Sequence, residues 1–165
     1  MLLTPGDSLS LRRPWTACGP TMNLGRAGDT TAMLLARFQT VLLFAPFPIH
    51  LMIGTNNPLP PEPAVADIKT MANQGRAAGS PIILCKIPTR GYNIADFNDA
   101  LAAMALAEGF DPPVDYWTPL ACSGNNNFPL YMPDGVHPNV AGYKAMDYAL
   151  FPRLDALGIW RPASD

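Results

Sequence analysis

The chain has few charged residues, only two histidines and no long apolar run. Charged side chains make up 15% of the 165 residues, the formal net charge is -2, and no stretch is rich in lysine or arginine. Because phosphate binding requires clustered lysine and arginine, a nucleic acid is not expected as the main partner. No apolar run approaches the roughly 20 residues that a membrane-spanning helix needs, so no membrane span is expected.

Cysteine is also scarce. The three cysteines, Cys18, Cys85 and Cys122, lie far apart and none belongs to a C-x-x-C pair. This spacing argues against a structural zinc site, and the odd count leaves at least one thiol free, as in a reducing compartment. Thr-Pro-Gly-Asp follows the first three residues, so no signal peptide is visible. We therefore expect a cytoplasmic protein unless a leader has been removed.

The remaining composition is that of a globular protein. Apolar residues make up 48% of the chain, and the length suits one domain with a sizeable core, so residues 1–165 are interpreted as a single domain. Many of the 19 prolines gather in short clusters, such as that at 58–61. These clusters separate periodic segments and are interpreted as stiff connectors.

Five short apolar runs predict strands, and segments of helical periodicity alternate with them. Two of the runs are nearly continuous in apolar character, which is typical of strands covered on both faces. The expected strands are Leu2–Pro5, Thr21–Leu24, Pro48–Gly54, Pro81–Ile87 and Val114–Thr118. The expected helices run from an Asp29–Thr31 cap to about Gln39, from Pro63 to Gly75 or Gly79, from Asn93 to Gly109, and onward from Asn139.

This alternation predicts an α/β fold with a mostly parallel, five-stranded sheet. In such sheets, functional groups gather at the carboxyl ends of the strands. Polar segments follow three of the expected strands, at Gly6–Ser8, Asn23–Asp29 and Gly54–Asn57. A fourth polar segment, Asp134–Asn139, precedes the last expected helix. The sequence therefore predicts a functional site where these four segments meet.

The Gly-Asp-Ser segment that ends at Ser8 is either an ordinary turn or a strand-to-helix elbow that presents a nucleophile. A serine nucleophile needs a base, and the two histidines are His50 and His137. His50 lies inside an apolar strand and is interpreted as a core histidine. His137 follows Asp134 by three residues, which lets the carboxylate hold Nδ1 and leaves Nε2 to take the serine proton. An ordinary turn and helix entry explains the same segment equally well.

Acyl transfer also needs donors aimed at the developing oxyanion. The candidates are the backbone N–H of Ser8, the backbone N–H of Gly28 and the side-chain amide of Asn56. Each has a plain alternative, because Gly28 can form a simple turn and Asn56 an Asx-turn. Asp7 is assigned to structure, because neighbouring residues at a strand end point in different directions.

Taken in order, these segments resemble the SGNH hydrolases, also called the GDSL esterase/lipase family. The resemblance runs from Leu3 to about Ala149 and rests on "GDS", "NLGRAGDTT", "IGTNN" and "DGVHPN". It implies a flavodoxin-like three-layer α/β/α sandwich. It also implies a nucleophilic Ser8, a base in His137 oriented by Asp134, and an oxyanion hole of Ser8, Gly28 and Asn56.

The chain departs from the family pattern in two places. Asn57 stands where the family usually has an aspartate after the Asn56 position, which removes a carboxylate that braces the loop. The segment between the first two motifs is short, so the first helix of the family is expected to be abbreviated and the pocket shallow.

The expected activity is that of a serine carboxyl-ester hydrolase that needs no metal or organic cofactor. The substrate is expected to be a small-molecule or carbohydrate ester with a short acyl or acetyl group. Acyltransfer to another alcohol or carbohydrate deacetylation would use the same residues. Trp15, Tyr116, Trp117 and Tyr131 either line a sugar-binding cleft or belong to the core. A non-catalytic module that binds carbohydrate or a protein partner is the minor alternative.

Overall fold

The computed structural model describes residues 1–15, 19–57, 59–88, 95–120 and 128–159. Four strands form one parallel sheet in the order β2-β1-β3-β4. Their bounds are Leu2–Gly6 for β1, Thr21–Gly25 for β2, Ile49–Leu51 for β3 and Ile82–Leu84 for β4. The α/β class and the parallel sheet predicted from the sequence are therefore confirmed.

The register brings the carboxyl ends of three strands to one edge. Gly6 at the end of β1 pairs with Gly25 at the end of β2. On its other side Gly6 forms a parallel bridge to Met52, just beyond β3. The polar segments that follow these strands consequently start from neighbouring points, as parallel pairing requires.

The prediction of a fifth strand at Val114–Thr118 is wrong for the described residues. Val114 forms only an isolated parallel bridge to Cys85. Pairing ends there because the Asp115 side chain closes a turn: its Oδ1 accepts from the backbone N–H groups of Trp117 and Thr118 at 2.9 and 3.0 Å. An aspartate that bonds the backbone two residues ahead replaces strand geometry with an Asx-turn.

Seven helices are present in the described part of the chain. Their bounds are Ser8–Arg12 (α1), Thr31–Ala36 (α2), Phe38–Leu42 (α3), Glu62–Ala77 (α4), Ala95–Ala107 (α5), Phe128–Tyr131 (α6) and Val140–Ala156 (α7). The expected abbreviated first helix corresponds to α1, which has five residues. The expected cap at Asn93 lies outside the described residues.

One expected helix, from residue 29 to about Gln39, is divided. Thr30 caps α2, and its side chain accepts from the Met33 N–H. At Arg37 the backbone leaves helical geometry (φ -110°, ψ 7°), and α3 begins at Phe38. The Arg37 side chain makes two hydrogen bonds with Asp29, and this tertiary contact coincides with the break.

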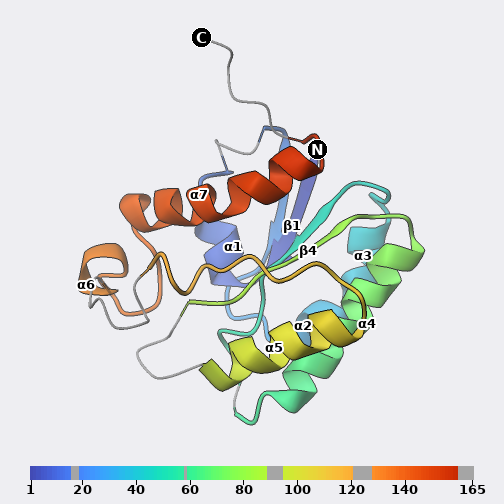
Figure 1. Ribbon diagram of the computed structural model, residues 1–165, viewed down its shortest axis with the longest axis horizontal. Coiled ribbons are helices and arrows are strands. Elements are labelled where there is room, and N and C mark those ends of the chain that lie inside the picture. Colours follow the sequence, from blue (N-terminus) through green and yellow to red (C-terminus); the bar gives the residue numbers. More distant parts are fainter. Residues whose placement is uncertain (16–18, 58, 89–94, 121–127, 160–165) are drawn as a thin grey trace.

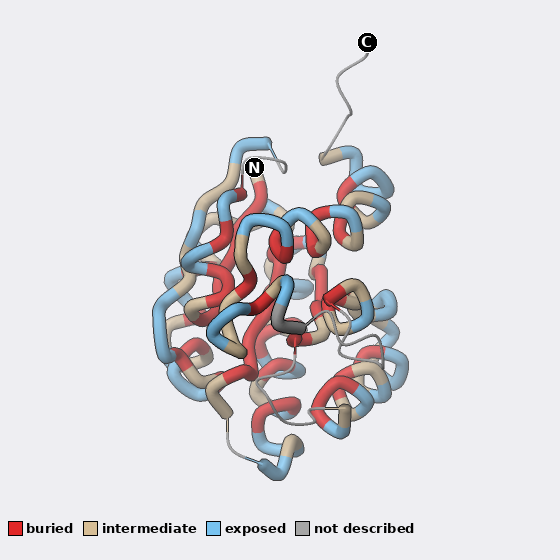
Figure 2. The backbone as a smooth tube through the Cα atoms, turned by 90° about the vertical axis from the view of Figure 1, so that its left-hand side faces the viewer, coloured by how far each residue is buried: buried red, intermediate tan, exposed pale blue. Residues whose placement is uncertain are grey.

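The helices cover both faces of the sheet. Helices α1 and α7 lie on one side of the strands, and α4 and α5 lie on the other (Figure 1). Figure 2 shows the buried backbone running through the centre of the molecule between these layers. Leu2, Leu3 and Ile49 on the strands are fully buried. This three-layer arrangement agrees with the fold expected from the sequence.

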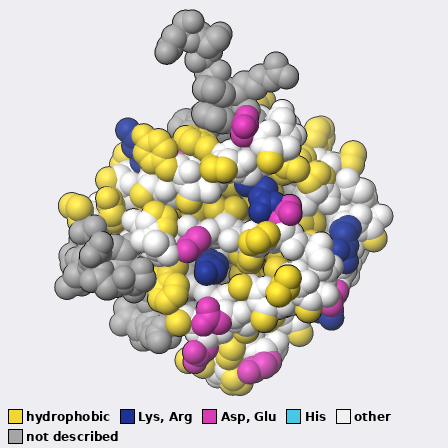
Figure 3. All heavy atoms as spheres, in the orientation of Figure 1, with side chains coloured by type: hydrophobic (Ala, Val, Ile, Leu, Met, Phe, Trp, Pro, Cys, Tyr) yellow, Lys and Arg dark blue, Asp and Glu magenta, His cyan; other side chains and the backbone are white. Residues whose placement is uncertain are grey.

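The surface is chemically mixed. On the face drawn in Figure 3, basic, acidic and apolar side chains are interspersed. Among the described residues, no helix combines the length and the apolar character that crossing a bilayer requires.

Candidate active site

Ser8 lies at a sharp transition from strand to helix. Strand β1 ends at Gly6, Asp7 caps α1, and Ser8 is its first residue. Asp7 Oδ1 accepts from the Leu9 N–H at 2.9 Å, which fixes the first turn of the helix. Only glycine fits at position 6, because a Cβ there would collide with Ser10 Oγ and the Met52 carbonyl. The local sequence thus places the Ser8 hydroxyl at the carboxyl edge of the sheet.

His137 and Asp134 meet Ser8 from the far end of the chain. His137 Nε2 lies 2.9 Å from Ser8 Oγ, and His137 Nδ1 lies 2.7 Å from Asp134 Oδ2. Ser8, His137 and Asp134, the candidate catalytic residues expected from the sequence, therefore form one continuous chain of hydrogen bonds. The His137 side chain is 21% exposed and that of Asp134 is 53% exposed, so solvent reaches this chain.

A tight loop fixes the carboxylate beneath the imidazole. Asp134 Oδ1 accepts from the backbone N–H groups of Val136 at 2.9 Å and His137 at 2.7 Å. Gly135 allows this turn by adopting φ 76°, a conformation that other residues rarely take. The His137 N–H, the imidazole and the Val136 N–H hold the pKa of Asp134 well below its usual range. The carboxylate is therefore ionised throughout the neutral range and orients the imidazole.

Asp7 is a buried carboxyl next to the nucleophile. Its side chain is fully buried, and burial raises the pKa from 3.8 to about 6. The Leu9 N–H, Thr55 and nearby His137 act in the opposite direction without offsetting the burial. The cap on α1 agrees with the structural assignment made from the sequence.

The segments that carry Gly28 and Asn56 are joined by a hydrogen bond. Asn56 Nδ2 donates to the Asp29 carbonyl at 3.1 Å, so the Asn56 amide lies against the loop that carries Gly28. Gly28 itself is exposed and has φ 80°. The two expected oxyanion donors are thus neighbours at the same edge of the sheet as Ser8.

Asn57 braces this loop in place of the usual aspartate. Its Oδ1 accepts from the Thr31 N–H at 3.1 Å, and its Nδ2 donates to Thr31 Oγ1 at 3.0 Å. The Thr31 hydroxyl in turn donates to Asp67 Oδ2 at 2.7 Å. An amide both donates and accepts, so the expected loss of a brace does not occur.

Arg37 contacts a loop of the candidate site, and the sequence analysis did not predict this contact. Its Nε and Nη2 donate to Asp29 Oδ2 at 2.9 and 2.7 Å, and Nη2 also donates to the Leu24 carbonyl at 3.0 Å. The guanidinium thus ties the Gly28–Asp29 loop to the end of β2. The chain contains no motif around Arg37, and its placement in a helical pattern gave no signal of this contact.

The aromatic residues considered for a sugar cleft divide into two groups. Trp15 and Tyr116 are buried in the core, at 8% and 0% exposure, and cannot line an open cleft. Trp117 and Tyr131 are partly exposed. His50 is fully buried, as the core interpretation expects, and burial holds its pKa well below its usual value. No three His, Cys, Asp or Glu side chains gather as metal ligands within the described ranges.

Comparison with known proteins identifies the family to which this fold belongs. Residues 11–145 match the model of the GDSL-like lipase/acylhydrolase family. No curated protein sequence matches the chain. The match covers most of the chain, so the protein belongs to the GDSL-like lipase/acylhydrolase family and is an ester hydrolase.

Solved structures agree in fold at low sequence identity. A GDSL-like lipase from Bacteroides thetaiotaomicron superposes with a TM-score of 0.79 at 21% identity, covering 94% of this chain and 88% of that one. TesA superposes with a TM-score of 0.74 at 23% identity, with coverages of 94% and 98%. A lipolytic G-D-S-L family member from Veillonella parvula gives 0.76 at 18% identity, with coverages of 92% and 96%.

Proposed function

We propose that the protein hydrolyses short-chain carboxylic esters through an acyl-enzyme formed on Ser8. The observation that carries the proposal is the hydrogen-bonded series Ser8 Oγ, His137 Nε2, His137 Nδ1 and Asp134 Oδ2. In this geometry the imidazole takes the serine proton as Oγ attacks the ester carbonyl. Asp134 holds the tautomer in which Nε2 is free to accept that proton.

The negative charge that develops on the carbonyl oxygen needs donors already in place. Backbone N–H groups of Ser8 and Gly28 and the Asn56 amide are assigned this role. The Gly28 loop and Asn56 are held together by the bond from Asn56 to Asp29, and the contact of Arg37 with Asp29 supports this loop. His137 then protonates the leaving alcohol, and water attacks the acyl-enzyme with His137 again acting as base.

The preference for short acyl groups rests on the openness of the site. Ser8 is half-buried, and both the imidazole and Asp134 are reached by solvent. An open site offers little apolar surface to a long acyl chain, and the binding of each added methylene depends on such surface. The same openness admits an alcohol in place of water, so acyltransfer is the second candidate activity.

The test is hydrolysis of p-nitrophenyl acetate, butyrate and octanoate at pH 8 by the wild type, Ser8→Ala and Ser10→Ala. Ser10 lies on the same helix, and its hydroxyl faces the Met52 carbonyl, so it controls for the loss of any helical serine. We expect activity in the wild type and in Ser10→Ala, highest on acetate, and none above background in Ser8→Ala. Equal rates in the wild type and Ser8→Ala would refute the proposal. Added alcohol that diverts acetate into a new ester would establish acyltransfer.

A further inference from the structure

The nucleophile helix is too short to hold its own geometry. A helix of five residues is unstable in isolation because nucleation costs more than so few hydrogen bonds return. Its last carbonyls lack partners within the helix. The Leu9 carbonyl accepts from Tyr143 Oη at 3.3 Å, and the Ser10 carbonyl accepts from Trp15 Nε1 at 3.1 Å. Side chains from elsewhere in the fold therefore hold α1.

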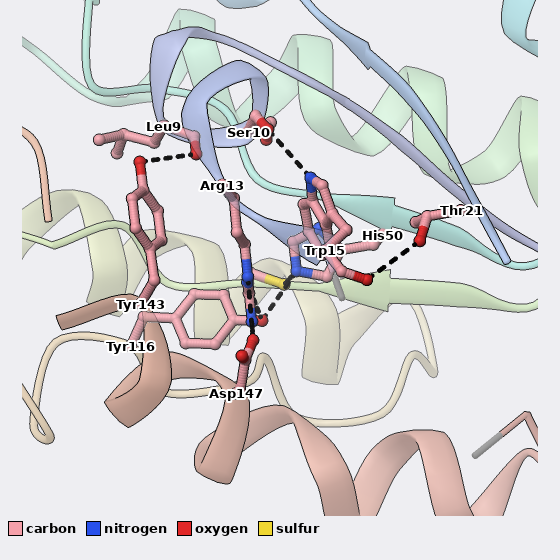
Figure 4. A network of polar contacts seen from close by, with 10 residues as sticks. Leu9, Ser10, Arg13, Trp15, Thr21, His50, Tyr116, Tyr143 and Asp147 are labelled. Carbon is pink, nitrogen blue, oxygen red and sulfur yellow. Dashed lines mark hydrogen bonds and ion pairs between the residues drawn. The ribbon is translucent and has the colours of Figure 1, made fainter. Parts of the chain in front are cut away.

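The residue that follows α1 forms a buried ion pair with α7. Arg13 is 3% exposed and Asp147 is 8% exposed. Arg13 Nε donates to Asp147 Oδ1 at 3.2 Å, and Nη2 makes a second, shorter contact with the same oxygen. Figure 4 shows the guanidinium between the Trp15 and Tyr116 rings, with Asp147 reaching it from below. Its carbon lies 4.3 Å from the Trp15 ring centre, so the guanidinium is fixed on several sides.

This pair is anchored to the sheet. Arg13 Nη1 donates to Tyr116 Oη at 3.1 Å, and Tyr116 Oη lies 2.8 Å from His50 Nε2. His50 belongs to β3, and its Nε2 lies 3.1 Å from Cys85 Sγ. Arg13 and Asp147 thus sit at the end of a polar chain rooted in the strands.

The contacts that Tyr143 and Asp147 make with α1 and with Arg13, the residue after it, come from one face of α7. Tyr143 and Asp147 are four residues apart, which places them one above the other on a helix. We use the name α1–α7 clasp for the two contacts Arg13–Asp147 and Leu9–Tyr143. The Asn139 cap of α7 lies two residues beyond His137, and the helix starts at the next residue. The clasp therefore joins the helix that begins with Ser8 to the helix that follows the His137 loop.

The last of the four strands, β4, ends at Leu84, so the His137 loop is not part of the sheet. The loop runs directly into α7 through the Asn139 cap, so the seating of α7 bears on its approach to Ser8. We propose that the α1–α7 clasp sets the Ser8–His137 approach, with Arg13, Tyr143 and Asp147 as positioning residues. This inference rests on the proposed function. A misplacement of about 1 Å between reacting groups costs on the order of 100-fold in rate, so small errors in seating are measurable.

The experiment separates positioning from stability by replacing the ion pair with apolar residues. Removing one partner leaves a buried charge, whereas replacing both by residues of similar volume is often neutral. We expect Arg13→Met combined with Asp147→Leu to melt closer to the wild type than either single variant. Its kcat on p-nitrophenyl acetate should still be about tenfold lower with KM unchanged. Labelling of Ser8 by a fluorophosphonate should slow by the same factor.

Tyr143→Phe provides a second variant that leaves every charge and the ring in place. It should lower kcat by about threefold to tenfold at unchanged KM. The matched control is Asp111→Asn, which breaks the ion pair of Asp111 with Arg153, another α7 residue, without touching α1. That control should keep the wild-type kcat.

The outcomes distinguish the two proposals. If the double variant and Tyr143→Phe are folded and turn over at the wild-type rate, the clasp is merely structural and the inference is overturned. If Ser8→Ala retains the wild-type rate, the proposed function itself fails. If the Asp111→Asn control loses kcat as much as the clasp variants, any loosening of α7 has this effect, and the specific role of the clasp is refuted.

Discussion

Replacing Asp7 by asparagine should stabilise the protein at neutral pH and much less in acid. The carboxyl is fully buried, and its pKa is raised from 3.8 to about 6. Between these two values the folded state binds more protons at this site than the unfolded state. Stability from this group is therefore fully present below about pH 4 and is lost as the pH rises through about 6.

The size of the effect follows from the two pKa values. A separation from 3.8 to about 6 corresponds to about 3 kcal/mol, at ~1.4 kcal/mol for each pH unit. Asparagine is as good a helix cap as aspartate, so it can keep the bond from the Leu9 N–H. The gain in unfolding free energy from Asp7→Asn should therefore be about 2–3 kcal/mol larger at pH 8 than at pH 4.

Urea unfolding of both proteins at pH 4 and pH 8 measures this difference directly. Titrating groups common to both proteins cancel in the difference between their unfolding free energies. The change in this difference, here called the gap, between pH 4 and pH 8 therefore reports on Asp7. Asp99→Asn, which removes an exposed carboxylate, is the matched control, and its gap should change little between the two conditions. A gap for Asp7→Asn that is equal at both pH values would refute the reasoning.

Three further substitutions test the loops around the site. Arg37→Met removes the bonds to Asp29 and should lower kcat on p-nitrophenyl acetate about tenfold with little change in KM. Arg37→Lys should recover part of the lost kcat. An unchanged kcat in Arg37→Met would exclude a positioning role for Arg37. Asn57→Asp loses the donor to Thr31 and should lower the urea-unfolding free energy by about 1 kcal/mol; a more stable variant would contradict the bracing described above. Asp134→Asn should reduce kcat on the order of 10⁴-fold in steady-state assays, and wild-type turnover would remove the carboxylate from the mechanism.

The sequence predicts the parts of this molecule that are encoded locally. Strand β1, the elbow at Ser8 and the Asp134–His137 loop depend on residues within a few positions of one another. The alternation of apolar runs with helical segments also predicts that the strands are parallel. The segments that follow the strands are therefore expected at one edge of the sheet. The Ser8–His137 contact could be expected because there are only two histidines and one of them lies in an apolar strand.

Contacts between distant side chains could not be predicted in the same way. Arg13 and Asp147 are 134 positions apart, and periodicity assigns each to a surface or a core without naming its partner. The break at Arg37 coincides with a contact to Asp29 that helix propensity alone does not predict. The predicted fifth strand does not form because the Asp115 side chain accepts from backbone N–H groups two and three residues ahead. The apolar residues around Asp115 favour a strand and gave no signal of this turn.

The most direct test of the mechanism is the identity of the residue that becomes covalently modified. The protein would be treated with a fluorophosphonate at pH 8, digested and mapped by mass spectrometry, beside Ser8→Ala and Ser10→Ala. A single adduct on Ser8, absent from Ser8→Ala and present in Ser10→Ala, is the predicted result. An adduct on another residue, or equal labelling of the wild type and Ser8→Ala, would contradict the assignment of Ser8 as the nucleophile.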